Sequence, residues 1–170
     1  MKFYRHSIRL KDYDYSQPGA YFVTIAAFQH ENLFGEIMNG EMRLNEYGNI
    51  AEECWRAIPE HFPNMELGVY VIMPNHVHGI IVIHEYKSLP SVRARHASPL
   101  RPNGVKPNSL GAVVGSFKSA VTHNIGQTNI WQRNYYEHVI RNEKEWDRIH
   151  RYIESNPMNW EIDEENLLRT

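Results

Sequence analysis

Residues 73–80 read Met-Pro-Asn-His-Val-His-Gly-Ile, and the apolar triplet Ile-Val-Ile follows at 81–83. The β-branched residues predict a strand, on which successive side chains point to opposite faces. We expect His76 and His78 to share one face, and Val77 and Ile80 to point into the opposite layer. Two imidazoles side by side on a rigid strand form half of a metal site. The alternative is an ordinary strand whose polar face carries two of the chain's ten histidines.

Length and composition indicate a globular protein. The chain has 170 residues, 42% of them hydrophobic, which is enough to bury a core, and we expect a single domain over residues 1–170. No apolar run approaches the roughly 20 residues of a membrane span, and the N-terminus lacks the apolar segment of a secretory signal. We therefore expect a cytoplasmic protein without a membrane partner. The single cysteine, Cys54, excludes an internal disulfide and a cysteine-rich zinc cluster.

Charge is segregated along the chain, although the net charge is only −2. Residues 86–142 hold 8 Lys or Arg against 1 Asp or Glu, whereas 1–85 hold 6 against 11 and 143–170 hold 4 against 8. A basic block of this kind is either a solvated loop or a surface for a polyanion. Its position next to the histidine pair leaves both interpretations open.

The remaining pattern predicts regular elements and two irregular segments. Strands are expected over residues 20–28, 67–73, 77–84 and 130–140, a short hairpin around Asn39-Gly40, and helices over 46–61, 110–125 and 143–155. Residues 1–17 are interpreted as an arm, and 88–108, with four prolines and no acidic residue, as a mobile basic loop. This order is typical of an α+β, ferredoxin-like (split βαβ) antiparallel sheet with helices on one face, followed by a C-terminal helix. The open face would carry the histidines.

The last predicted helix places Tyr152 and Asn156 four residues apart, so their side chains share a face. A tyrosine is a nucleophile that forms a phosphodiester with DNA and can leave again as a phenolate. A divalent cation held by two imidazoles and one amide or carboxylate oxygen would polarise the scissile phosphate. On spacing alone, the simpler interpretations are a half-buried helix tyrosine and a plain C-cap asparagine. The acidic stretch from Glu161 onward is interpreted as peripheral.

At the level of motifs, the sequence resembles the single-tyrosine HUH transposases of small bacterial insertion sequences, and especially the REP-associated tyrosine transposases. The resemblance rests on Pro-Asn-His-Val-His-Gly at 74–79, Trp-Gln-Arg at 131–133 and Tyr-Ile-Glu-Ser-Asn-Pro at 152–157. It implies an enzyme that nicks and rejoins single-stranded DNA at hairpin-forming ends. Relatives act as monomers or as homodimers, so the resemblance leaves the oligomeric state open.

That resemblance also implies roles for individual residues. His76, His78 and Asn156 would bind Mg²⁺ or Mn²⁺, and the nucleophile Tyr152 would take the 5′-phosphate and free a 3′-OH. Two other functions compete with strand transfer: a DNA-hairpin-binding protein of the same fold without cleavage, and a metal-dependent phosphoesterase that uses water. The phosphoesterase would need a general base in place of Tyr152, and a covalent protein–DNA adduct would separate all three functions.

Affinity for DNA is expected to come from the basic middle segment. Its cations lie in two settings, the loop and the regular elements after it; they are Arg93, Arg95, Arg101 and Lys106 in the loop, and Lys118 and Arg133 on or beside regular elements. Loop cations are free to wrap a single strand, whereas cations on regular elements can grip a hairpin stem. Each phosphate contact would add to the salt dependence of binding.

Overall fold

The computed structural model describes residues 13–85, 106–163 and 165–166. Four strands form an antiparallel sheet in the order β4-β5-β1-β6. The strands are β1 (Gly19–Ala26), β4 (Met65–Ile72), β5 (His76–Ile83) and β6 (Tyr136–Ile140). Because β5 lies between β1 and β4, the first βαβ unit is split, which confirms the predicted ferredoxin-like α+β fold.

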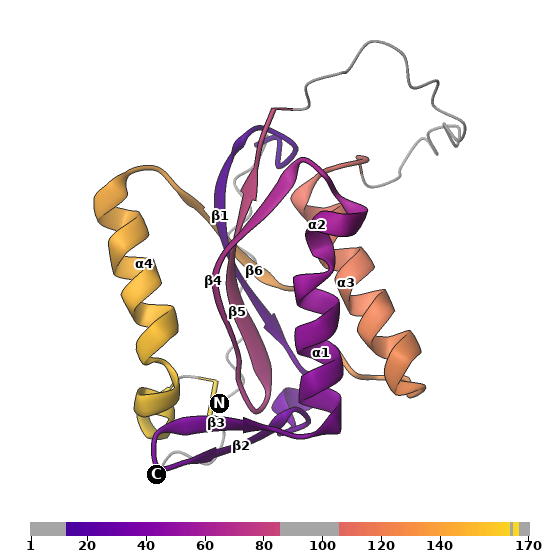
Figure 1. Cartoon of the computed structure of the whole chain (residues 1–170), viewed down its shortest axis with the longest axis vertical. Coiled ribbons are helices and arrows are strands. Elements are labelled where there is room, and N and C mark those ends of the chain that lie inside the picture. Colours follow the sequence, from indigo (N-terminus) through magenta and orange to yellow (C-terminus); the bar gives the residue numbers. More distant parts are fainter. Residues whose placement is uncertain (1–12, 86–105, 164, 167–170) are drawn as a thin grey trace.

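Helices cover both faces of this sheet, as Figure 1 shows. On one face lie α1 (Glu46–Arg56), α2 (Ile58–His61) and α3 (Leu110–Ile125). On the other lies α4 (Glu143–Ser155), which continues into the 3₁₀ segment η2 (Pro157–Ile162). The face that the sequence left open for the histidines is therefore the face on which the C-terminal helix packs. Among the described residues, no helix has the length and apolar character needed to cross a membrane.

Local signals set the helix ends. The side chains of Asn45, Ser109 and Asn142 each accept a backbone N–H at the starts of α1, α3 and α4. Helices α3 and α4 have the predicted bounds. The single helix expected to end at His61 is instead α1 followed by the short α2. Pro59 explains the break, because it lacks the amide N–H that would continue the hydrogen-bond ladder of α1.

The alternation along β5 separates two cores. Val77 joins the core under α1 and α3, whereas Ile80 packs with Ile149 and Ile153 of α4. The expectation that Ile80 shares the layer of Val77 is wrong, because a period of two places residue 80 on the face of the histidines. On that face α4 is therefore anchored directly to the strand that carries the candidate metal ligands.

The strand expected over residues 130–140 is shorter than predicted, and β6 begins at Tyr136. Residues 130–135, the first half of the predicted strand, form a connection. Within this connection Trp131 makes one isolated β-bridge to Ala27. Lys118 gives the reason, since its ammonium donates hydrogen bonds to the carbonyl oxygens of residues 132–134 at 2.7, 3.3 and 3.4 Å. These carbonyls are thereby taken out of the sheet ladder.

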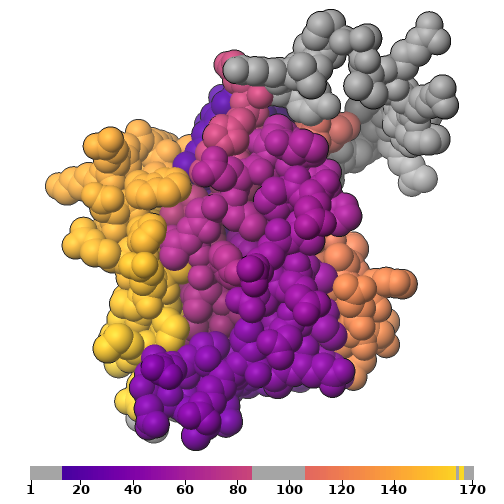
Figure 2. Space-filling view, viewed as in Figure 1, coloured from indigo at the N-terminus to yellow at the C-terminus, as the bar shows by residue number. Residues whose placement is uncertain are grey.

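Strands β2 (Gly35–Met38) and β3 (Glu41–Leu44) form the predicted hairpin, which follows β1 and the 3₁₀ turn η1 (Phe28–His30). Asn39 and Gly40 both have positive φ, 54° and 77°, as a type I′ turn requires. Strand β3 contacts η2, and in the space-filling view the hairpin lies at the bottom of the molecule, beneath the yellow end of α4 (Figure 2). The hairpin thus supports the segment that follows the tyrosine helix.

Candidate metal and nucleophile site

His76 and His78 lie next to each other at the start of β5, with ring centroids 4.3 Å apart and exposed fractions of 0% and 2%. Nδ1 of His76 is 2.8 Å from Oδ1 of Asn75, and Nδ1 of His78 is 2.9 Å from Oγ1 of Thr24 on β1. An amide oxygen only accepts, so Nδ1 of His76 carries the ring proton and Nε2 has the lone pair. This is the neutral form of histidine that binds metals.

The Asn75 side chain fixes the His76 tautomer that has its proton on Nδ1. Its Nδ2 donates to the carbonyl oxygens of His30 at 3.1 Å and Glu165 at 2.7 Å. Because both contacts need a donor, the amide orientation is settled, and Oδ1 is the atom that faces His76. Partners of this kind hold a metal-binding imidazole in one orientation and raise its basicity.

Tyr152, in the last turn of α4, lies beside His78. Its hydroxyl is 3.2 Å from Nε2 of His78, and the side chain is 45% exposed. One tautomer satisfies both contacts of His78: Nδ1–H donates to Thr24, and Nε2 accepts from Tyr152. The tyrosine ring lies 5.2 Å from the ring of His78 and edge-on to Phe22 at 6.1 Å. The hydroxyl is therefore positioned beside His78, on a side chain that is partly open to solvent.

Asn156 ends α4 as its C-cap residue and is only 1% exposed. Its Nδ2 donates to Oδ2 of Asp163 at 2.7 Å. Its Oδ1 is buried and has no hydrogen-bond partner among the described residues. A buried carbonyl oxygen without a donor is costly, and a divalent cation is a partner that would satisfy it. Asn156 is linked to the histidines through Asp163, which donates no proton and groups with both imidazoles. The donor set therefore fits the metal that the sequence implied.

Asp163 is the site residue that sequence reasoning missed. One ligand atom from each of His76, His78 and Asp163 lies within 4.8 Å of the other two, and all three residues are buried. The interpretation of the stretch from Glu161 as peripheral is wrong at this position. No local pattern marks Asp163, because it follows the recognised motif and reaches the site only through the turn of η2.

The predicted DNA contacts fall into three groups. Lys118 is committed to the carbonyl oxygens of residues 132–134, and burial lowers its pKa to about 8. Arg133 lies in that segment and is exposed. Lys106 pairs with Asp14 at 2.8 Å, and hydrogen bonds from Lys106 and Ser16 lower the pKa of the Asp14 carboxyl to about 2.

The third group, Arg93, Arg95 and Arg101, lies outside the described residues, as do most of the 88–108 loop and residues 1–12 of the arm. The described end of the arm contributes Tyr13 and Tyr15, which pack against the core. Roles in DNA binding stay predictions for all six cations.

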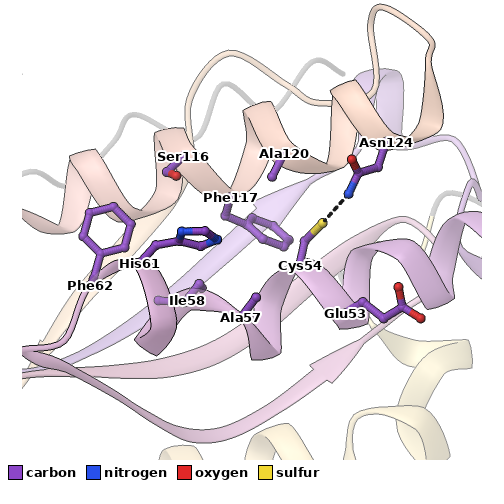
Figure 3. Close-up of a pocket in the computed structure, with 10 residues that line it drawn as sticks. All are labelled: Glu53, Cys54, Ala57, Ile58, His61, Phe62, Ser116, Phe117, Ala120 and Asn124. Atoms are coloured by element: carbon purple, nitrogen blue, oxygen red, sulfur yellow. Dashed lines mark hydrogen bonds between the residues drawn. The ribbon is translucent and has the colours of Figure 1, made fainter.

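A separate groove of about 250 Å³ lies between α1, α2 and α3, on the face of the sheet opposite the histidines. Figure 3 shows Cys54 and His61 facing Ser116 and Asn124 across it. Asn124 donates a hydrogen bond to Sγ of Cys54 at 3.4 Å, and burial raises the pKa of this thiol. Cys54 is partly buried and packs against the apolar core beneath α1 and α3.

Comparison with known proteins shows which sequences the chain resembles. No family model matches the chain. An uncharacterized protein of Haemophilus influenzae is 42% identical over 166 residues, which are 95% of this chain and 92% of that protein. A REP-associated tyrosine transposase of Escherichia coli is 30% identical over 93 residues, 55% of this chain and 44% of that protein.

The fold comparison agrees with the sequence comparison. The solved structure of a REP-associated tyrosine transposase bound to a REP hairpin has a TM-score of 0.62 to this chain, with 20% identity and coverage of 89% of this chain and 73% of that one. The resemblance inferred from the motifs is confirmed. In sequence and in fold, the chain is similar to the REP-associated tyrosine transposases.

Proposed function

We propose that this protein is a metal-dependent DNA strand transferase of the single-tyrosine HUH kind, which nicks and rejoins single-stranded DNA at hairpin ends through a 5′-phosphotyrosine intermediate. The observation that carries the proposal is the Tyr152 hydroxyl, which is 3.2 Å from Nε2 of His78 and belongs to a side chain that is 45% exposed. A phosphate can reach this oxygen while it lies beside the two imidazoles. The similar fold solved with a REP hairpin supports hairpin DNA as the substrate class.

The reaction exchanges one phosphodiester for another. The phenolic oxygen of Tyr152 attacks the scissile phosphorus and forms a bond to the 5′-phosphate, while the bond from phosphorus to the 3′-oxygen breaks. The phenol loses its proton to water on its exposed side, and the departing 3′-oxygen gains a proton to become a 3′-OH. Because the linkage to tyrosine is itself a phosphodiester, attack by a 3′-OH in the reverse direction rejoins a strand.

The cation, Mg²⁺ or Mn²⁺, would be held by His76, His78 and Asn156. Support comes from the tautomer of His76, which has its lone pair on Nε2, and from the buried Oδ1 of Asn156, which has no hydrogen-bond partner among the described residues. Metal binding by Nε2 of His78 would replace its hydrogen bond from Tyr152. When bound, the cation polarises the scissile phosphate and offsets the negative charge that develops on it. The chain's own contribution is to hold these donors in place.

Apolar packing positions the nucleophile. Ile149 and Ile153 of α4, 7% and 0% exposed, pack on Phe22 and Ile80 of the sheet. This packing holds the part of α4 that carries Tyr152 against the sheet. The ring of Tyr152 also contacts Phe22. A nucleophile held in this way needs little further ordering before it reacts.

The proposal is tested by covalent capture. A pool of labelled single-stranded oligonucleotides with one hairpin end is incubated with Mn²⁺ and the protein, then run on a denaturing gel. We expect an adduct with the wild type and none with Tyr152→Phe, whose hairpin affinity should stay within a few-fold because one oxygen is lost. Tyr136→Phe is the matched control, since Tyr136 also contacts Phe22 and should form the adduct.

Two results would contradict the proposal. An adduct formed by Tyr152→Phe would place the nucleophile elsewhere, with Tyr135 and Tyr136 as the next candidates. Tight hairpin binding by the wild type without any adduct would support the hairpin-binding protein instead.

A further inference from the structure

We infer that Asp163 binds the same cation directly, so that the site consists of two imidazoles, one carboxylate and one amide. The inference rests on the proposed function, because it takes His76 and His78 as metal ligands. It adds a ligand from a segment that follows the tyrosine helix, seven residues after Asn156. With Asp163 as a ligand, the site gains one negative charge and one carboxylate oxygen donor.

The geometry places Asp163 within reach of the ion. Asp163 is the C-cap residue of η2, and one of its carboxylate oxygens lies with one nitrogen of His76 and one of His78 inside a 4.8 Å limit. Ligand atoms about 2.2 Å from a common ion lie roughly 3 to 4.5 Å from one another. Small movements of these side chains are therefore sufficient for them to share one cation.

The charge of Asp163 has no protein partner in the part of the chain that the structure describes. The residue is 7% exposed, and its carboxylate accepts N–H groups from the Asn156 side chain and the Glu165 backbone, each at 2.7 Å. Both donors are neutral, and the described ion pairs do not include Asp163. A buried carboxylate is costly without a countercharge, which a divalent cation supplies.

The carboxylate also prepares Asn156 as a ligand. Because a carboxylate only accepts hydrogen bonds, its contact with Asn156 uses the amide nitrogen and leaves Oδ1 as the free acceptor. Two neutral imidazoles and an amide would leave a divalent ion with its full charge. One carboxylate reduces the net charge of the site to +1, which strengthens cation binding and still attracts a phosphate.

Direct metal titration tests the assignment without any reaction. Mn²⁺ is titrated calorimetrically into the full chain as wild type, Asp163→Asn and Glu161→Gln. Glu161 is exposed in the same segment, so its substitution removes one charge without touching the site. We expect Asp163→Asn to lose at least about tenfold in Mn²⁺ affinity and Glu161→Gln to stay within about twofold. Wild-type affinity in Asp163→Asn would overturn the assignment.

A second measurement covers the case in which Asp163→Asn fails to fold. Hydrogen exchange of the wild type is followed with and without saturating Mn²⁺. If Asp163 is a ligand, the metal joins η2 to β5, and the Glu165 amide, which donates to Asp163 at 2.7 Å, should exchange several-fold more slowly. Unchanged exchange in residues 157–166, with slower exchange in β5, would show that the metal binds without Asp163.

The two proposals fail in different ways. If the wild type binds Mn²⁺ through Asp163 but forms no covalent adduct, strand transfer is wrong and the ligand assignment stands. If the adduct forms and Asp163→Asn binds Mn²⁺ like the wild type, strand transfer stands and the assignment is wrong.

Discussion

The two faces of the sheet share the same strands but differ in what they bury. Beneath α1 and α3 the core is apolar and aromatic, with Trp55 fully buried and in edge contact with Phe117. Beneath α4 the apolar cluster has four buried members, Phe22, Ile80, Ile149 and Ile153. Beside that small cluster lie buried polar groups, which include the two histidines, Asn156 and Asp163.

This difference separates stability from chemistry. Apolar burial supplies most of the free energy of folding, and it is concentrated on the α1–α3 face. The α4 face carries polar groups whose burial costs free energy unless each has a partner. A substitution on one face should therefore change the free energy of unfolding, and a substitution on the other should change metal binding and cleavage.

The largest stability effect is expected at Trp55. Trp55→Ala empties a fully buried position and should lower the free energy of unfolding by about 3–5 kcal/mol, as measured by urea denaturation. Trp146 on α4 is half-buried against the smaller cluster, and Trp146→Ala should cost less than half as much. Equal losses would contradict the difference between the faces.

A sharper comparison uses neighbours on β5 that point to opposite faces. Val77→Ala opens a cavity under α1 and α3 and should lower the free energy of unfolding by about 1–3 kcal/mol, with Mn²⁺ binding kept. His76→Ala should remove metal-dependent cleavage and weaken Mn²⁺ binding. Calorimetric Mn²⁺ titration and thermal melts on both variants measure this. If His76→Ala bound Mn²⁺ with wild-type affinity, the proposed metal site would be wrong.

Substitution of surface charges should leave both faces intact. With all four loop cations replaced by serine, at positions 93, 95, 101 and 106, hairpin affinity should weaken and its salt dependence should flatten by roughly 0.7 in log–log slope per lost contact. The melting temperature should barely change, because the pair between Lys106 and Asp14 is exposed and such pairs contribute little. Filter binding at several salt concentrations gives the slope, and an unchanged slope would place the DNA path elsewhere.

The smallest effect is expected from the one described lysine whose pKa is lowered by burial, Lys118. Burial lowers its pKa from 10.5 to about 8, so between these values the unfolded chain binds more protons than the folded one. The free energy of unfolding should therefore rise with pH from about 8 to 10.5, by about 1 kcal/mol after screening. Urea melts at pH 7.5 and 9.5 test this, with Lys118→Gln as the control that lacks the rise. Parallel pH dependence in both proteins would contradict it.

Sequence patterns predicted the features that depend on neighbours in the chain. The bounds of α3 and α4, the Asn39-Gly40 turn and the shared face of His76 and His78 all follow from caps, positive φ or alternation. These signals lie within a few residues of the structure they determine.

The errors arose where distant contacts decide the structure. Lys118 shortens β6 by binding carbonyls 14 to 16 residues away. Asp163 reaches the histidines through the turn of η2, which no sequence motif marks. The sequence pattern therefore predicts a peripheral acidic stretch where the structure has a residue of the site. The break at Pro59 is different, since its cause was visible in the sequence but was outweighed by the helical pattern around it.

The distance along the chain between the parts of the site has a consequence for biosynthesis. Tyr152 and His78 are 74 residues apart, and the contact of Asn75 with Glu165 spans 90. A chain leaving the ribosome presents the histidines long before it presents the nucleophile, and the α4 face closes only after residue 163 has been made. Under the proposed function, a partly synthesised chain would be unable to cut DNA, because its histidine strand has no tyrosine beside it.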